Sequence, residues 1–211
     1  HYNKPMYEIE LKAHVHDREK TISLINGFAE YCGTTIKDDE YHHFELSSDH
    51  KIPAGQIPPE TTHLTCRFRH EKYTYPDNTT KTQDLLTYKK KERRTNNDGT
   101  TYEVNEENET ILSDASAVKK LLLDTGYVLA YTKHKDVMQW TTKTPYGEAH
   151  LELCDIQSLG DFLEIEVVSE NCSNENEIRK ELENLIVKSG LSLSDIEKKY
   201  YSELLKENNN G

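Results

Sequence analysis

The sequence contains no long hydrophobic run and no excess of basic residues. No apolar stretch approaches the roughly 18 residues of a membrane-spanning helix, and the mean hydropathy is −0.87. The net charge of −12 disfavours a general nucleic-acid-binding protein, which would carry a basic excess. No signal-peptide pattern opens the chain. We therefore expect a cytoplasmic protein that has neither a nucleic acid nor a membrane as its partner.

Cysteine and proline are also scarce. The four cysteines are scattered and form no CxxC pair, which argues against a zinc site or a disulfide framework and favours a reducing cytosol. Three of the six prolines lie between residues 47 and 63, so this stretch is predicted to be a long loop. A second polar loop is predicted over residues 72–84.

Alternating apolar and polar residues predict a fold rich in strands. Strands are predicted at residues 6–15, 41–46, 64–70, 85–91, 101–112, 127–135, 137–143, 148–154 and 161–168. Helices are predicted at residues 17–32, 113–125, 174–189 and 192–207, with Asp17 as the first cap. The chain of 211 residues suits one domain. We expect an α+β fold dominated by an antiparallel sheet or barrel, with helices outside it.

The same charge pattern recurs in seven of the predicted strands. In "YEIELKAHV", Glu8, Glu10 and Lys12 alternate with aliphatic residues and therefore share one face of a strand. Equivalent faces carry Arg67 and Arg69, Lys89 and Lys91, Glu107 and Glu109, Lys133 and Lys135, Glu148, His150, Glu152 and Cys154, and Glu164 and Glu166.

A solvent-facing side would explain one such strand, because antiparallel sheets commonly expose one face. The recurrence favours a second interpretation, in which the sheet closes and the charged faces line a lumen. Buried charges need compensation. A polyanion bound with divalent metal ions would supply it, because Arg and Lys bind phosphate oxygens and clustered carboxylates bind Mg²⁺ or Mn²⁺. The residues alone thus indicate a metal-dependent triphosphate site.

Together these residues resemble the CYTH family, the triphosphate tunnel metalloenzymes, and most closely its class IV adenylyl cyclases. The likeness begins with the ExExK strand at residues 8–12 and continues through "CRFR", "LTYK", "EENE", "TKHK" and "SLGDFLEIE" to "YYSELL" at residues 200–205. The resemblance implies one CYTH domain over residues 1–211. It would consist of a closed eight-stranded antiparallel barrel over about residues 6–168, forming a tunnel, with peripheral helices that include C-terminal ones at about 174–207.

The resemblance also implies roles for individual residues. Glu8 and Glu10 are implied as catalytic metal ligands, and Lys12 as a catalytic-site residue that contacts phosphate. The implied metal ligands are Glu8, Glu10 and Glu166, with Glu164 close by and Glu152 as a substitute, because Cys154 stands where many relatives carry aspartate. The implied substrate-binding residues are Lys12, Arg67, Arg69, Lys89, Glu107, Glu109, Lys133 and Lys135. Lys135 stands where arginine is common, which removes a bidentate contact.

Three activities follow from the resemblance. The first is the conversion of ATP to cyclic AMP and pyrophosphate, with Mg²⁺ or Mn²⁺ as cofactor. The second is the hydrolysis of inorganic tripolyphosphate or thiamine triphosphate. The third is the binding of a nucleotide or polyphosphate without turnover. In each case the partner is ATP or another triphosphate, and a homodimer remains open.

Overall fold

The computed structural model describes residues 6–44, 65–95, 101–169 and 174–209, and side chains within 8–44, 65–88, 108–169 and 174–208. The strands are β1 (Met6–His14), β2 (Glu30–Phe44), β3 (Thr65–Thr74), β4 (Thr80–Thr95), β5 (Thr101–Leu112), β6 (Tyr127–Thr144), β7 (Gly147–Ile156) and β8 (Gly160–Ser169). The helices are α1 (Arg18–Ile25), α2 (Ala115–Asp124), α3 (Glu175–Lys188) and α4 (Tyr201–Asn209), and a 3₁₀ turn spans Leu193–Asp195. Among these described helices, none is long and apolar enough to cross a membrane.

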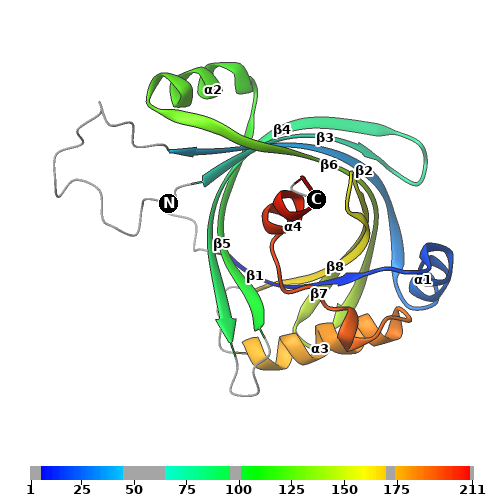
Figure 1. Ribbon diagram of the computed structural model, residues 1–211. Helices are drawn as coiled ribbons and strands as arrows, with labels where there is room; N and C mark the ends of the chain where they lie inside the picture. The colour runs from blue at the N-terminus through cyan, green and yellow to red at the C-terminus, as the bar shows by residue number, and fades with distance from the viewer. Residues whose placement is uncertain (1–5, 45–64, 96–100, 170–173, 210–211) are drawn as a thin grey trace.

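The eight strands pair in antiparallel fashion in the order β1-β5-β4-β3-β2-β6-β7-β8. β1 pairs with β5 along one edge and with β8 along the other, which is the connectivity of a closed barrel. The strands surround α4, whereas α1, α2 and α3 lie outside the ring (Figure 1). The predicted α+β class with a dominant antiparallel sheet of eight strands is confirmed.

The main core lies between α3 and the outer faces of β1, β7 and β8. The residues that alternate with the charged positions on these strands point outward and are almost fully buried against the helix. They include Ile9, Leu11, Leu151, Leu153, Leu163 and Ile165 on the strands and Ile178, Leu182 and Ile186 on α3. On this side of the ring, the expectation that a helix covers the apolar strand faces is confirmed.

A second apolar cluster lies on the inner face of the ring. Val137, Cys154, Ile156 and Phe162 pack there against Tyr201 and Leu204 of α4. Helix α4 therefore occupies part of the lumen and is not peripheral as predicted (Figure 1).

The predicted helix over residues 192–207 is also wrong as a single element. Ile196 forms a bridge with Ala13, and the N–H of Glu197 donates to the carbonyl of Lys12 at 2.8 Å. These contacts use the edge of β1 beyond Glu10, where its pairing with β5 stops. An unpaired strand edge offers hydrogen-bonding groups to another segment. The chain therefore runs extended past β1 before α4 begins.

The other corrections concern where elements begin and end. The helix predicted at 17–32 ends at Ile25, although Asp17 caps it as expected by accepting a hydrogen bond from the N–H of Lys20 at 3.0 Å. β2 starts at Glu30 and not at 41, because its β-branched stretch Thr34–Ile36 pairs with both β3 and β6.

Two further predictions were too short or too divided. The strands predicted at 127–135 and 137–143 form the single strand β6, whose pairing with β2 and β7 continues through Val137. The loop predicted at 72–84 shrinks to a turn between Thr74 and Thr80. Asn78 adopts φ 65° in this turn, a conformation that Asn tolerates well. The loop predicted at 47–63 lies outside the described residues.

Gly33 generates a prediction about stability. Its φ is +133°, and a Cβ there would lie 2.3 Å from the carbonyl oxygen of Thr74 on β3. We expect Gly33→Ala to lower the free energy of unfolding by more than about 2 kcal/mol, because backbone strain and a clash with backbone act together. Denaturant unfolding measures the change.

Gly160 provides the matched control. Its φ is +88°, but no atom lies within 4 Å of the position that a Cβ would occupy there. Gly160→Ala should therefore cost only about 1 kcal/mol, from backbone strain alone. Equal losses in the two variants would show that the close approach of β2 to β3 does not constrain the ring of strands.

Candidate functional site

Three carboxylates meet on the inner face of two adjacent strands. Glu8 and Glu10 come from β1 and Glu166 from β8, where Glu10 and Glu166 are cross-strand partners. One oxygen of each side chain lies within 4.8 Å of the others, and all three side chains are half-buried. The alternation of β1 aims both of its glutamates at one point, as the sequence predicted. A hard divalent cation suits such a set of oxygen donors.

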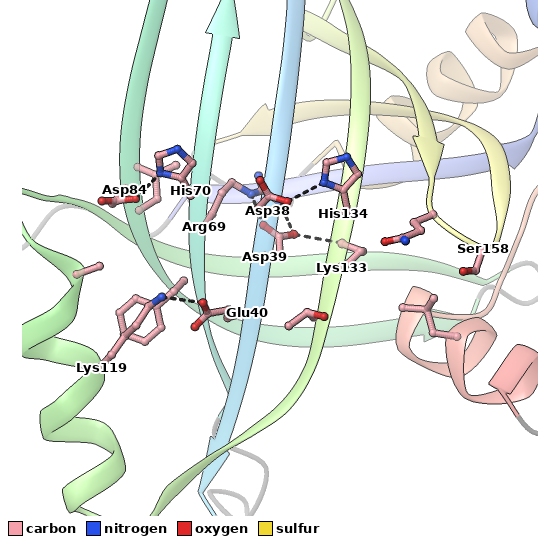
Figure 2. A pocket seen from close by; sticks show the side chains of 16 residues that line it. Asp38, Asp39, Glu40, Arg69, His70, Asp84, Lys119, Lys133, His134 and Ser158 are labelled. Carbon is pink, nitrogen blue, oxygen red and sulfur yellow. Dashed lines mark hydrogen bonds and ion pairs between the residues drawn. The ribbon is translucent and has the colours of Figure 1, made fainter.

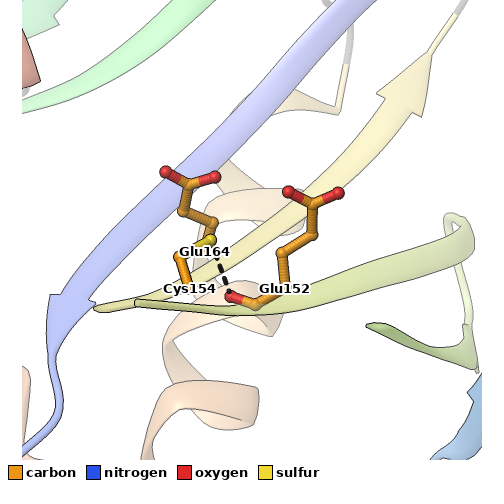
Figure 3. A group of neighbouring side chains, drawn as sticks. All are labelled: Glu152, Cys154 and Glu164. Atoms are coloured by element: carbon orange, nitrogen blue, oxygen red, sulfur yellow. Dashed lines mark hydrogen bonds between the residues drawn. The ribbon is translucent and has the colours of Figure 1, made fainter. Parts of the chain in front are cut away.

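A second group combines Glu152, Cys154 and Glu164, whose donor atoms also lie within 4.8 Å of one another (Figure 3). Here lysines already supply positive charge. Lys135 Nζ lies 2.7 Å from both oxygens of Glu164, and Lys37 Nζ lies 2.5 Å from Glu152 Oε1. The structure therefore divides the five predicted metal ligands into a carboxylate trio and a pair that is bound to lysines.

The electrostatics of the second group follow from these contacts. Burial raises the pKa of Glu152, but the ammonium groups of Lys37 and Lys135 outweigh it and lower the pKa to about 2. Burial likewise opposes the charge of Glu164, and Lys135 and Lys133 still hold its pKa well below the ordinary range. Burial raises the pKa of the Cys154 thiol far above its usual value, so the thiol stays neutral. Two carboxylates thus balance two ammonium groups.

Asp39 on β2 is a central charge of the lumen that the sequence analysis missed. Its fully buried carboxylate accepts two hydrogen bonds from Arg69, at 2.6 Å from Nε and 3.0 Å from Nη2, and lies 3.5 Å from Lys133 Nζ (Figure 2). Burial raises the pKa of Asp39, but Arg69 overrides this and holds it far below the ordinary value. Arg69 is therefore the bidentate partner of a buried carboxylate in this structure.

Arg67 precedes Arg69 by two residues on β3, so both side chains lie on the same face of the strand. Its Nη2 donates to Thr87 Oγ1 at 3.0 Å and lies 3.4 Å from Glu109 Oε2, so the structure brings these two predicted residues together. Lys89 and Glu107 are backbone partners across β4 and β5, although their side chains lie outside the described set. A cavity of about 590 Å³ adjoins the network, but most of its lining comes from the outer face of β2, β3, β4 and β6 and from α2, as with Asp38, His134 and Lys119 (Figure 2). Asp39, Arg69 and Lys133 also belong to its lining.

Three of the lumen lysines converge on one aromatic ring. The ammonium groups of Lys12, Lys135 and Lys133 lie 4.6, 4.9 and 5.0 Å from the ring centroid of Tyr201 in α4. Lys12 Nζ also donates a hydrogen bond of 2.6 Å to the carbonyl of Lys199. The C-terminal segment is thus part of the site.

The sequence contains a signal for the missed residues Lys37 and Asp39 but none for Tyr201. Lys37 and Asp39 alternate in "TIKDDEY" as the other lumen charges do, but the predicted strand began after them. Tyr201 lies in "YYSELL", a segment whose sequence shows no sign that it enters the ring, because its apolar residues fit an outer helix equally well.

Comparisons with solved structures support the fold. No family model matches the chain, and no curated protein matches it significantly. The PH1819 protein of Pyrococcus horikoshii superposes with a TM-score of 0.70 at 20% identity, over 95% of this chain and 98% of that one. A candidate adenylate cyclase from Vibrio parahaemolyticus gives 0.65 at 15% identity, over 95% and 98%.

A third similar structure comes from a plant. It is HpAC1 of Hippeastrum, a candidate adenylyl cyclase for which a dominant triphosphatase activity is described. The TM-score is 0.52 at 13% identity, and the match covers 88% of each chain. At these identities the three likenesses establish the shared fold of the chain.

The buried pair of Asp39 and Arg69 generates a prediction about stability. Arg69→Met would leave the Asp39 carboxylate buried without its bidentate partner, so we expect the free energy of unfolding to fall by about 3–5 kcal/mol. The double variant Asp39→Asn/Arg69→Met removes both charges and should recover most of this loss. Denaturant unfolding of the three proteins at neutral pH measures the difference.

Acid titration provides an independent readout of the same pair. Because Arg69 lowers the folded-state pKa of Asp39 below its ordinary value of 3.8, the pair's stabilisation is complete above that value and is lost as the pH falls below it. Between about pH 5 and pH 2 the wild type should lose stability more steeply than the double variant. If Arg69→Met is as stable as the wild type, Arg69 does not serve as a structural partner.

Proposed function

We propose that this chain binds the triphosphate group of ATP or a similar compound inside the strand ring and acts on it with the help of a divalent metal ion. The observation that carries the proposal is the arrangement of charge on the inner face. Glu8, Glu10 and Glu166 form a compact oxygen-donor set, and basic side chains from β1, β3 and β6 lie on the same inner face. Such a combination suits a polyanion that is bound together with a hard cation.

The metal site is proposed at the carboxylate trio. Three oxygen donors within 4.8 Å fit Mg²⁺ or Mn²⁺, which bind few protein carboxylates and share the phosphate oxygens of the substrate. When bound, the ion would neutralise phosphate charge and make an attacking hydroxyl more acidic. Glu152 and Glu164, which the sequence also indicated as ligands, are assigned to holding Lys37 and Lys135 in place.

The phosphate groups are proposed to bind to Lys12, Arg67 and Lys133, with Lys89 and Lys135 beside them. Arg67 presents a planar guanidinium that can contact two phosphate oxygens at once. Lys12 lies on the same face of β1 as the metal ligands, and we assign it to phosphate contact rather than to proton abstraction. Arg69 donates two hydrogen bonds to Asp39. We therefore propose that it fixes the Asp39 carboxylate in place.

The reaction proposed first is cyclisation of ATP. The ribose 3′-oxygen would attack the α-phosphorus in line and lose its proton, the bond from the α-phosphorus to the bridging oxygen would break, and pyrophosphate would leave. The lysines and Arg67 would stabilise the charge that develops on pyrophosphate. The likeness of "YYSELL" to cyclases supports this assignment, since that segment borders the site through Tyr201.

The alternative is hydrolysis, in which water attacks the γ-phosphorus of a nucleoside triphosphate, tripolyphosphate or thiamine triphosphate. The same basic residues and the same metal site would serve this reaction. The observation that favours it is the similar structure of HpAC1, whose dominant activity is that of a triphosphatase. Binding without turnover is the remaining alternative.

Product analysis separates these reactions. We expect ATP with Mg²⁺ or Mn²⁺ to give cyclic AMP and pyrophosphate, with parallel incubations on tripolyphosphate and thiamine triphosphate. ADP and orthophosphate would identify the chain as a triphosphatase on the same scaffold. Absence of turnover, with tight binding of the triphosphates, would leave a binding protein. A wild type that neither binds nor converts any of the three compounds would contradict the proposal as a whole.

The metal ligands generate a further prediction. Glu10→Gln keeps the size of the side chain but removes one of three negative charges, so we expect Mn²⁺ affinity to fall at least roughly tenfold and turnover to be lost. Electron paramagnetic resonance of bound Mn²⁺ and product assays measure the two effects. The melting temperature should stay near that of the wild type.

Glu148→Gln is the matched control, because Glu148 lies on the neighbouring strand β7 and its side chain is 54% exposed. It should leave both Mn²⁺ binding and turnover unchanged. Wild-type metal affinity in Glu10→Gln would place the ion elsewhere. An equal loss of Mn²⁺ affinity in both variants would mean that the overall negative charge of the protein attracts the ion and that no defined site binds it.

A further inference from the structure

Tyr201 occupies an unusual position for a residue of the C-terminal helix. Its ring lies inside the strand ring, within 4.6–5.0 Å of three ammonium groups that come from two different strands. Its other neighbours fix it in place, because Phe162 meets the ring edge-on at 5.2 Å and Leu204 packs on the same inner apolar cluster.

The electrostatic character of the ring explains what such a contact achieves. The face of an aromatic ring carries partial negative charge and attracts ammonium groups within about 6 Å, most strongly where water is excluded. Unlike a carboxylate, the ring has no net charge. It can therefore hold a lysine without adding a negative charge. This matters most for Lys12, since Lys135 is paired with Glu164 and Lys133 lies 3.5 Å from Asp39.

The contacts of Lys12 illustrate this difference. Its described partners are the Lys199 carbonyl and the Tyr201 ring, both uncharged and both supplied by the C-terminal segment. Lys135, in contrast, is bound by both oxygens of Glu164. The segment that delivers Tyr201 is itself attached to β1, through the hydrogen bond from Glu197 to Lys12 and the bridge from Ile196 to Ala13.

We infer that Tyr201 is a positioning residue for the triphosphate site, which holds Lys12, Lys133 and Lys135 in a phosphate-binding arrangement through the face of its ring. This inference rests on the proposed function, because it concerns how the same site recognises a triphosphate. It assigns to α4 a part in substrate affinity that goes beyond packing. Neither the ring nor its hydroxyl takes part in bond making.

Fluorination of the ring tests the inference with little change in shape. Tyr201→Phe should bind inorganic tripolyphosphate as the wild type does, since the ring remains. Phenylalanines with an increasing number of fluorine atoms at position 201 should raise the dissociation constant stepwise, to roughly tenfold for the most fluorinated ring. Calorimetry in the presence of EDTA measures binding without turnover.

The same series at Tyr75 is the control, because this tyrosine lies in the β3–β4 turn and is 41% exposed. It should leave the affinity unchanged.

Equal affinity across the fluorinated series at position 201 overturns the inference, even if Tyr201→Leu binds weakly, because the residue would then act only by packing. Loss of affinity in Tyr201→Phe also overturns it, since the hydroxyl would then be responsible. If the wild type binds tripolyphosphate and all variants match it, only this inference fails. If the wild type binds it neither with EDTA nor with Mg²⁺, the proposed function fails as well.

Discussion

The structure depends on the balance of charge inside the ring of strands. On β1, β7 and β8, the strands that contribute a charged inner face also contribute a row of apolar residues to the outside, so the two faces cannot be chosen independently. The outer rows create the core with α3. The inner rows then place lysines, arginines and carboxylates close together, where they are stable only if they pair. Asp39 with Arg69, Glu164 with Lys135 and Glu152 with Lys37 satisfy this requirement.

This pairing also sorts the acidic residues by role. Carboxylates that lie against lysines keep low pKa values and serve as fixed counter-ions, whereas the trio on β1 and β8 gathers negative charge at one point. Glu164 and Glu166 lie only two residues apart on β8, yet Glu164 contacts a lysine and Glu166 belongs to the carboxylate trio. A cation at the trio and a polyanion beside it would complete the balance that the side chains begin.

Much of the fold was predictable because its signal is periodic. Alternation identified the inward residues of β1, β7 and β8, including Glu8, Glu10 and Glu166, and the antiparallel class followed from the succession of strands. The missed features are tertiary. Asp39 was overlooked because it lies between the helix predicted at 17–32 and the strand predicted to begin at 41. The entry of α4 into the ring depends on a free edge of β1, which exists only after β5 has stopped pairing, and no local pattern encodes that.

The contact between Lys12 and the Lys199 carbonyl joins residues 187 positions apart in the chain. Contacts of such long range form late, because closing a large loop costs conformational entropy before any interaction repays it. The pairing of β1 with β8 carries a similar cost, since Tyr7 and Ser169 are 162 positions apart. Ring closure and docking of the C-terminal segment thus both wait for the last quarter of the chain, so the site can form only after nearly all of the chain has been synthesised.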